Sequence, residues 1–356
     1  MVRNSNFKGR LYMRKKLEVK NLQISFRTDD GMLQAVRDIS FSLEEGRTLA
    51  IVGESGSGKS VTSRAIMGIL PGNARVEGGQ ILYEGQDLLK LSEQALCDLR
   101  GSRIAMIFQD PLSALNPVMR IGKQITEVMI HKNGKSPAEA KNRALELMKE
   151  VGITNPQRCF EQYPFQLSGG MRQRVVIAIA LAGDPEILIC DEPTTALDVT
   201  IQAQILELIS RLKRERALSV IFITHDLGVV ANMADDIAVM YAGKIVEYGT
   251  AEETFYDPRH PYTWALLASM PDLDTKDRLE SIPGTPPNML YPPVGDAFAE
   301  RNPYALEIDF LEEPPVFQIT PTHWAATWLL HPHAPRLQPP WAVRRRIERM
   351  TGGERA

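Results

Sequence analysis

Gly53-Glu54-Ser55-Gly56-Ser57-Gly58-Lys59-Ser60 is the stretch of this 356-residue chain that decides the fold. It carries a glycine, four residues and then Gly-Lys-Ser, which matches the phosphate-loop pattern at every fixed position. The apolar run from Thr48 to Val52 predicts a strand that leads into the loop. A helical pattern from Val61 to Leu70, stopped by Pro71-Gly72, leads out of it. Because strand, loop and helix form the context that the pattern requires, we favour a phosphate site over a glycine-rich turn that binds nothing.

The chemistry of a phosphate loop explains each of these residue types. Glycines let backbone N–H groups turn inward around an anion without Cβ clashes. The following helix directs its positive N-terminal end at the same anion. Lys59 is expected to reach the β- and γ-phosphates, and the Ser60 hydroxyl is expected to ligate Mg²⁺. The sequence therefore predicts that the chain binds a nucleoside triphosphate.

The composition and charge of the chain argue against several other kinds of protein. The net charge of −3 is too near neutral to indicate a nucleic-acid-binding surface, so we expect no nucleic-acid partner. The three cysteines, Cys97, Cys159 and Cys190, are odd in number and far apart, which argues against a disulfide framework and fits a reducing cytosol. No run of about 18 apolar residues is present to span a bilayer. Residues 1–16 carry six basic and no acidic side chains and lack the apolar centre of a signal peptide, so we expect a disordered lead-in.

Strand and helix patterns alternate along the chain. Apolar or alternating runs predict strands at 17–26, 35–43, 48–52, 78–83, 103–108, 187–190, 220–224, 237–240 and 244–248. Helical spacing occurs at 61–70, 138–151, 172–182 and 201–216. Such alternation around a phosphate loop predicts an α/β core with a mainly parallel sheet. The helical block at about 110–182 is then an insertion in that core.

The composition shifts after about Asp257. Sixteen of the 24 prolines and all four tryptophans lie beyond it. We expect residues 258–341 to form an irregular but ordered C-terminal extension, because they keep aromatic and aliphatic side chains. Residues 342–356 are charged and contain glycine, so this tail is expected to fray.

Two carboxylates follow a predicted buried strand at residues 187–190. Asp191 is delivered to the mouth of the sheet, where it can hold Mg²⁺ directly or through water. Glu192, one residue later, is placed to polarise an attacking water as a general base. A strand that simply ends in solvated acids is the alternative, and we disfavour it downstream of a phosphate loop.

A second glycine-rich turn, Leu167-Ser168-Gly169-Gly170-Met171-Arg172-Gln173, also precedes a helix. It is either an ordinary helix start capped by Ser168 or a second anion site made of that hydroxyl, the glycine N–H groups and the helix N-terminus. One chain would then hold two helix N-termini that bind phosphate but only one complete binding loop for a triphosphate. This arrangement suggests a dimer with the nucleotide in its interface.

Three further residues stand where they can reach the nucleotide. His225 ends the predicted strand 220–224 and can contact the γ-phosphate. Gln109 follows the strand 103–108 and can touch Mg²⁺ and the attacking water. Phe26 precedes the phosphate loop and either stacks on adenine or packs in the core.

Together these motifs, with the run Thr195-Ala196-Leu197-Asp198, resemble the nucleotide-binding subunit of an ABC transporter over about residues 17–257. The resemblance implies a P-loop ABC ATPase core with a mainly parallel sheet, an antiparallel β subdomain and a helical subdomain. It implies catalytic roles for Glu192, His225 and Gln109, Mg²⁺ ligation by Ser60, Gln109 and Asp191, and a D-loop at Asp198. ATP binding is implied for Phe26, Gly53, Glu54, Ser55, Gly56, Ser57, Gly58, Lys59, Ser60 and Val61. Binding of a partner subunit's ATP is implied for the signature residues Leu167, Ser168, Gly169, Gly170, Met171, Arg172 and Gln173.

The C-terminal extension restricts the resemblance to one group of ABC importers. The stretches 257–263 and 282–287 are similar to the region that follows the ATPase core in oligopeptide, dipeptide and nickel importers, and the whole chain is most similar to the oligopeptide permease ATPases of Gram-positive bacteria. Many members carry four cysteines there that are thought to ligate an iron–sulfur cluster. At the positions that align, this chain has Asp296, Asn302, Asp309 and Thr327, so we expect no cluster.

The resemblance also implies partners and a location. We expect a second ATPase subunit, a related but different chain, together with two membrane-spanning permease subunits and an extracytoplasmic peptide-binding protein. The chain would lie at the cytoplasmic face of the membrane as a peripheral protein and power oligopeptide import. Dipeptide or nickel import and a soluble ABC ATPase without a transport role are the alternatives.

Overall fold

The computed structural model describes residues 14–195, 197–231, 233–270 and 282–352. Some predicted segments lie outside this part of the chain. They are residues 1–13 of the lead-in, residue 196 of the run that ends at Asp198, and the last four residues of the tail. None of the described helices is both long and apolar enough to cross a bilayer.

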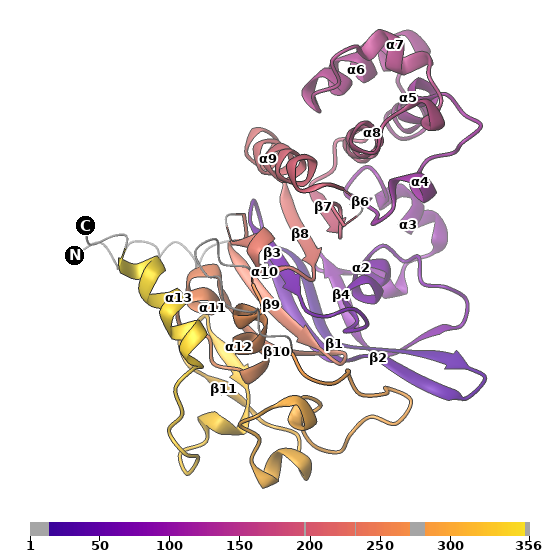
Figure 1. Cartoon of the computed structure of the whole chain (residues 1–356). Helices are drawn as coiled ribbons and strands as arrows, with labels where there is room; N and C mark the ends of the chain where they lie inside the picture. The colour runs from indigo at the N-terminus through magenta and orange to yellow at the C-terminus, as the bar shows by residue number, and fades with distance from the viewer. Residues whose placement is uncertain (1–13, 196, 232, 271–281, 353–356) are drawn as a thin grey trace.

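An eight-stranded sheet forms the centre of the molecule (Figure 1), with the strand order β11-β12-β10-β9-β3-β8-β7-β6. Its parallel part consists of β3 (Thr48–Val52), β6 (Ile104–Ile107), β7 (Ile187–Asp191), β8 (Ser219–Thr224) and β9 (Asp236–Tyr241). Every residue of these five strands is buried, which explains why they read as unbroken apolar runs. β10 (Lys244–Thr250) pairs antiparallel to β9, so the two strands form a hairpin.

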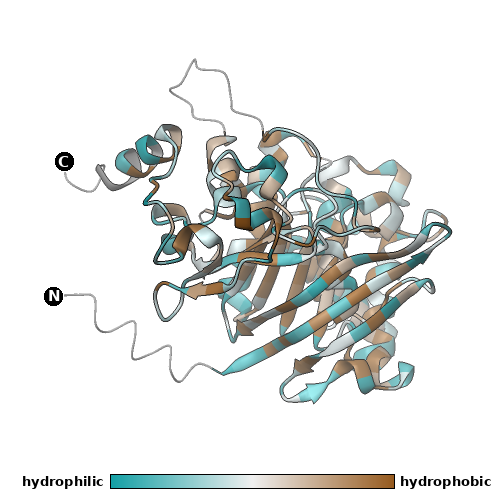
Figure 2. Ribbon diagram, turned by 90° about the horizontal axis from the view of Figure 1, so that it is seen from below, coloured by the Kyte–Doolittle hydropathy of each residue, from teal (hydrophilic) through white to brown (hydrophobic). Residues whose placement is uncertain are grey.

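Alternate residues of the parallel strands enter two different apolar clusters. In β3, Ala50 and Val52 pack with the helical side of the molecule, whereas Leu49 and Ile51 pack with the second sheet. This second sheet is antiparallel and consists of β1 (Lys15–Thr28), β2 (Gly31–Glu44), β4 (Ala74–Tyr83) and β5 (Gln86–Asp87). Figure 2 shows the hydrophobic residues concentrated on the strands at the centre of the molecule. The predicted α/β core with an antiparallel β subdomain is confirmed.

Helices occupy the block at 110–182, as predicted. They are α4 (Pro111–Ala114), α5 (Ile121–Asn133), α6 (Pro137–Glu150), α7 (Pro156–Glu161), the 3₁₀ turn η2 (Pro164–Gln166) and α8 (Gly169–Leu181). They form the lobe at the upper right of Figure 1. α6 begins at a capping box formed by Ser136 and Glu139, and Pro137 occupies its first helical position.

The remaining helices lie along the core and the extension. They are α2 (Lys59–Ile66), η1 (Leu88–Lys90), α3 (Glu93–Leu99), α9 (Val199–Arg216), α10 (Leu227–Val230), α11 (Ala251–Tyr256), α12 (Pro261–Ala268), η3 (Ala299–Arg301), η4 (Glu307–Phe310), η5 (Trp328–Leu330) and α13 (Trp341–Gly352).

The C-terminal extension is more regular than the sequence predicted. Its strand β12 (Trp324–Ala326) pairs antiparallel with β10, and β11 (Val316–Gln318) pairs antiparallel with β12, so the extension lengthens the main sheet. The Trp324 ring stacks on Tyr248 at 6.1 Å between centroids. Beside this pair, the fully buried His323 ring contacts Glu247, with 2.8 Å between Nε2 and Oε1. Strands of three residues are too short for an alternating pattern to reveal them.

The tail was predicted to fray, and this prediction was wrong for most of it. Residues 341–352 form α13. Val343 is fully buried and Ile347, one turn later, packs against the same apolar cluster. The Arg345 guanidinium lies over the Trp341 ring at 5.0 Å. Among the described side chains of this charged helix, Val343 and Ile347 therefore anchor it on the protein.

Candidate functional site

The phosphate loop lies between β3 and α2, as the sequence predicted, and its backbone has the conformation that requires glycine. Gly58, which precedes the first residue of α2, has φ of 101°. A Cβ on Gly58 would lie 2.5 Å from the carbonyl oxygen of Ala35, and one on Gly53 would lie 2.0 Å from that of Met240. The neighbouring backbone therefore excludes any larger residue at these two positions.

Lys59 lies inside the loop, with 4% of its surface exposed. Its ammonium group donates to the carbonyl oxygens of Gly53 (2.7 Å) and Glu54 (2.8 Å). Burial lowers the pKa of Lys59, while the nearby carboxylates of Glu192 and Asp191 oppose this shift. A cation held at the centre of a ring of backbone groups suits the binding of polyphosphate oxygens.

Ser60 and Asp191 face each other across the mouth of the sheet. The Ser60 hydroxyl donates to Asp191 Oδ1 at 2.8 Å. The Asp191 carboxyl is 3% exposed, and its burial raises its pKa. Hydroxyl and carboxylate oxygens are the ligands that Mg²⁺ prefers. Among the described residues no three His, Cys, Asp or Glu side chains are grouped for a metal, so phosphate oxygens and water would have to complete the coordination.

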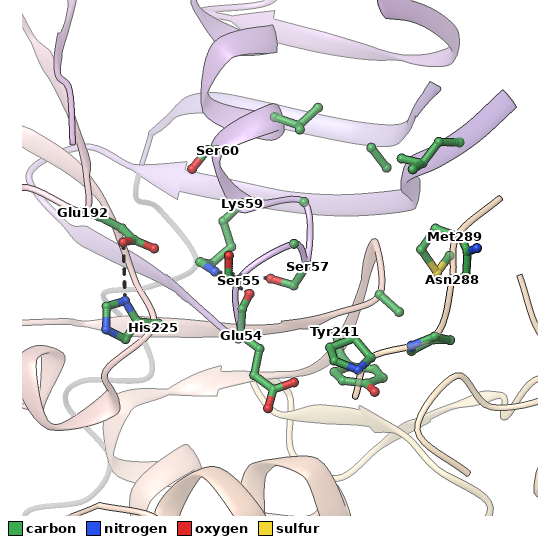
Figure 3. Close-up of a pocket in the computed structure, with 18 of the residues that line it drawn as sticks. Glu54, Ser55, Ser57, Lys59, Ser60, Glu192, His225, Tyr241, Asn288 and Met289 are labelled. Atoms are coloured by element: carbon green, nitrogen blue, oxygen red, sulfur yellow. Dashed lines mark hydrogen bonds and ion pairs between the residues drawn. The ribbon is translucent and has the colours of Figure 1, made fainter. Parts of the chain in front are cut away.

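Gln109, Glu192 and His225 meet at the carboxyl ends of three adjacent parallel strands, β6, β7 and β8. Glu192 Oε2 accepts a hydrogen bond from Gln109 Nε2 (3.1 Å) and lies 3.4 Å from His225 Nδ1 (Figure 3). It also accepts from the Thr195 hydroxyl (3.0 Å), a contact that the sequence did not predict. The backbone of Glu192 is left-handed, with φ of 47°. Strain of this kind is common where a reactive side chain is held in place.

One cavity of about 1060 Å³ joins these groups to the phosphate loop. Its walls include the loop from Glu54 to Val61 and the side chains of Gln109, Glu192 and His225. Phe26 also lines it and at the same time packs against the apolar cluster of the second sheet, so both sequence-based interpretations of this residue have a basis.

Several lining residues were missed by the sequence analysis. Leu33 and Ala35 come from β2, and Ile282, Pro286, Pro287, Asn288 and Met289 come from the C-terminal extension. The stretch 282–287 had contributed only a family resemblance. No local pattern indicates that it folds back onto a loop more than 200 residues earlier in the chain.

The predicted signature residues lie apart from this cavity, and none of them lines it. Ser168 and Gly169 are exposed at the start of α8, in the helical lobe (Figure 1). Ser168 Oγ accepts from the backbone N–H of Met171 at 3.4 Å, so the ordinary helix cap is present. Asp198 caps α9 in the same way through the N–H of Ile201 (3.0 Å). The start of α8 therefore faces solvent in this chain.

Comparisons of sequence and of structure with known proteins give matches to the same kind of protein. The ABC transporter family matches residues 36–195, and the family "Oligopeptide/dipeptide transporter, C-terminal region" matches residues 246–308. The chain is 60% identical to the dipeptide transport ATP-binding protein DppD of Lactococcus lactis, over 91% of this chain and 94% of that protein. It is 58% identical to the oligopeptide transport ATP-binding protein OppD of Bacillus subtilis, over 94% of each. Among solved structures, it resembles the dimeric bacterial ABC cassette MJ0796, with a TM-score of 0.60 and 28% identity over 66% of this chain and 98% of that one.

Proposed function

The chain belongs to the ABC transporter family, within its oligopeptide and dipeptide transport ATP-binding proteins, and from this premise we propose that it hydrolyses ATP to power the import of oligopeptides. Relatives at 56–60% identity are named for oligopeptide or for dipeptide transport. Dipeptide import is therefore the second candidate, favoured by the match to the Lactococcus lactis protein. The match of the C-terminal region argues against an ABC ATPase without a transport role.

The observation that carries the proposal is the meeting of Gln109, Glu192 and His225 beside the phosphate loop. The Glu192 carboxylate would take a proton from water as this water attacks the γ-phosphorus, which breaks the bond to the β-phosphate oxygen and releases ADP and phosphate. His225 and Gln109, within 3.4 Å and 3.1 Å of Glu192, would orient that carboxylate and the water. Lys59 would neutralise charge on the β- and γ-phosphates.

Magnesium fits the oxygen ligands available. Ser60 and Asp191 would hold the ion, with Gln109 nearby, and the ion would supply charge neutralisation at the phosphates. The buried Asp191 carboxylate is paired with hydroxyl groups of Ser60 and Ser63, at 2.8 Å and 3.4 Å. A cation at this position would favour the ionised carboxylate that burial disfavours.

We further propose that two ATPase subunits complete each other's sites. The exposed signature turn at Ser168 would contact ATP bound to the phosphate loop of the partner. The similar cassette MJ0796 was solved as a dimer and also in a post-hydrolysis state with ADP and Pi. The partner would be a related but different ATPase chain, and the pair would dock on two permease subunits at the cytoplasmic face of the membrane. An extracytoplasmic binding protein would deliver the peptide.

The Glu192→Gln variant tests the chemistry. It keeps the size of the side chain but removes the base, so ATP binding should stay within a few-fold of wild type. Phosphate release by the assembled transporter, and uptake of a labelled oligopeptide into vesicles, should fall by roughly 10²–10⁴-fold. Glu215→Gln is the control, because Glu215 is an exposed residue of α9 whose partner, Arg211, is 3.9 Å away. Turnover of the Glu192 variant near the wild-type rate would remove this residue from the role.

A further inference from the structure

The cavity has two ends of different character. Glu192 and His225 lie at one end, the phosphate loop lies in the middle, and Asn288 and Met289 lie beyond Ser57 at the other end (Figure 3). If the γ-phosphate lies beside Glu192, the nucleoside of the same molecule must extend toward the opposite end. Phe26, Leu33 and Ala35 line the cavity from the antiparallel sheet. A further part of the wall, residues 286–289, belongs to the C-terminal extension.

The wall is held in place by the protein itself. The carbonyl oxygen of Met289 accepts a hydrogen bond from the backbone N–H of Gln34 in β2 (3.1 Å). Met289 is 9% exposed and belongs to the main apolar cluster. Asn288 Oδ1 accepts from the N–H of Leu290 (3.0 Å), which fixes the turn, and two prolines precede it. The wall is therefore preorganised, which reduces the entropy cost of binding a nucleoside.

Arg301 connects this wall to the phosphate loop. Its guanidinium, 5% exposed, makes two parallel contacts with Glu54: Nη1 to Oε2 at 2.6 Å and Nη2 to Oε1 at 2.9 Å. Its Nε donates to the carbonyl oxygen of Pro283 (2.7 Å), at the start of the segment that leads to the wall. Nη1 also donates to the Tyr241 hydroxyl on β9 (3.1 Å). A bidentate fork of this kind fixes geometry as well as contributing energy.

A second contact ties the loop to the extension. The backbone N–H of Glu54 donates to the hydroxyl of Tyr262 on α12 at 2.8 Å. Tyr262 packs with Tyr241 and Phe298 in an aromatic group with centroid distances of 4.6 Å and 5.3 Å. The backbone and the carboxylate of Glu54 are thus both held by residues that follow the ATPase core.

We propose that the C-terminal extension is part of the nucleotide site: residues 286–289 form one wall of the nucleoside subsite, and Arg301 is the positioning residue that holds this wall and the phosphate loop in register. This inference rests on the proposed ATPase function. The C-terminal extension would then contact the base and ribose of ATP.

The first experiment distinguishes contacts with the nucleoside from contacts with the phosphates. Binding of Mg·ATP and of magnesium tripolyphosphate to the full chain is measured by calorimetry for wild type, Met289→Ala and Met289→Leu. The alanine variant should weaken ATP binding by about tenfold, because it removes apolar atoms from the wall of the pocket, and leave tripolyphosphate binding within twofold. The leucine variant should restore most of the affinity. Tyr291→Ala is the control, because Tyr291 is 76% exposed and does not line the cavity.

The second experiment tests Arg301 in the assembled transporter. Arg301→Gln should raise the KM for ATP by about tenfold and change kcat by less than threefold, because the chemical groups at Glu192 are untouched. The double variant Glu54→Gln with Arg301→Gln removes both charges and should cost no more than the worse single variant, since the two act as a unit. Arg259→Gln is the control, because the carboxylate that pairs with Arg259 is its near neighbour Asp257.

The outcomes distinguish the inference from the function on which it rests. Wild-type protein that binds neither ATP nor tripolyphosphate would contradict the proposed ATPase. ATP binding by wild type that is unchanged in Met289→Ala, or that falls together with tripolyphosphate binding, overturns the nucleoside wall. Additive effects of the Glu54 and Arg301 substitutions on KM overturn the positioning role, and melting temperatures of all variants verify that each one folds.

Discussion

At the scale of single residues, four buried polar side chains stabilise turns of the extension. Each accepts a hydrogen bond from a backbone N–H nearby: Asp296 from Phe298 (3.0 Å), Asn302 from Tyr304 (2.9 Å), Asp309 from Leu306 (2.6 Å) and Thr327 from Leu329 (3.3 Å). These are the positions where the family resemblance aligns cysteines. In this chain their oxygens already have a structural role.

We therefore predict that the protein folds without an iron–sulfur cluster. A cluster takes thiolate ligands, and the thiols available are in the ATPase core: Cys97 is exposed, and burial raises the pKa of Cys190 and raises that of Cys159 to about 11. Protein purified without oxygen should show no broad absorbance near roughly 400 nm. Stoichiometric iron and acid-labile sulfide in such preparations would contradict this prediction.

Asp296 should make the stability of the protein depend on pH. Burial raises its pKa to about 6, and the charges of Asp309 and Glu313 act in the same direction, against Lys244 and the Phe298 N–H. The folded state therefore binds a proton that the unfolded state releases near pH 4, so this residue's contribution to stability is lost as pH rises from about 4 to about 6.

The Asp296→Asn variant keeps the acceptor oxygen and removes the charge. It should be more stable than wild type at pH 7.5, by about 1–3 kcal/mol, and nearly equal to it at about pH 3.5, below the pKa of the unfolded state. Urea unfolding at both pH values measures this difference. Asp30→Asn, in an exposed turn, is the control, and an advantage that is the same at both pH values would exclude titration of Asp296 as the cause.

The sequence predicted those site residues that a strand or a loop motif delivers. Gln109, Glu192 and His225 each follow an apolar strand, and parallel strands bring their carboxyl ends to one edge. Met289 and Arg301 could not be found in this way, because their positions depend on tertiary contacts with Gln34 and Glu54.

At the scale of elements, the start of α8 is the part of the helical lobe that we propose contacts the partner's nucleotide. Ser168 and Gly169 are exposed there, and neither Gly169 nor Gly170 has a side chain that could cover the first turn. We predict that Ser168→Arg lowers the rate of ATP hydrolysis by the assembled transporter at least tenfold, because a bulky side chain would fill the position that we propose for the partner's phosphates.

The same variant should bind ATP at its own phosphate loop with unchanged affinity, because the signature residues do not line that cavity. Binding of a fluorescent ATP analogue to the isolated chain checks this. Ser113→Arg, an exposed position of α4, controls for the added charge. Weaker binding by the isolated Ser168 variant would mean that the signature turn acts within its own chain.

Elements were predictable where burial is complete or where a cap marks the boundary. The five parallel strands are buried at every residue and therefore stand out as apolar runs. β11 and β12 have three residues each and are stabilised by pairing with β10 rather than by their own pattern. α13 escaped prediction because Val343 and Ile347 are few among many charged neighbours.

At the scale of the whole molecule, the two helix N-termini that we propose as phosphate-binding sites lie in different parts of the fold. α2 begins at the central sheet and α8 begins in the helical lobe (Figure 1), so one chain does not close both ends on one nucleotide. We predict slow turnover by the isolated chain, with a specific activity that rises with protein concentration or on addition of the partner ATPase. Rapid, concentration-independent hydrolysis by a species that light scattering shows to be monomeric would contradict the shared-site arrangement.

The pairing of Glu54 with Arg301 has a consequence for the synthesis of the protein on the ribosome. The two residues are 247 positions apart. At about 5–20 residues per second, roughly 10–50 s separate the synthesis of the phosphate loop from that of the arginine that holds it. During that interval the Glu54 carboxylate lacks its Arg301 partner, and the edge of β10 is not yet paired with β12. The pocket that we propose for the nucleotide therefore acquires residues 286–289 and Arg301 well after the phosphate loop has been synthesised, and its affinity for ATP should be lower until then.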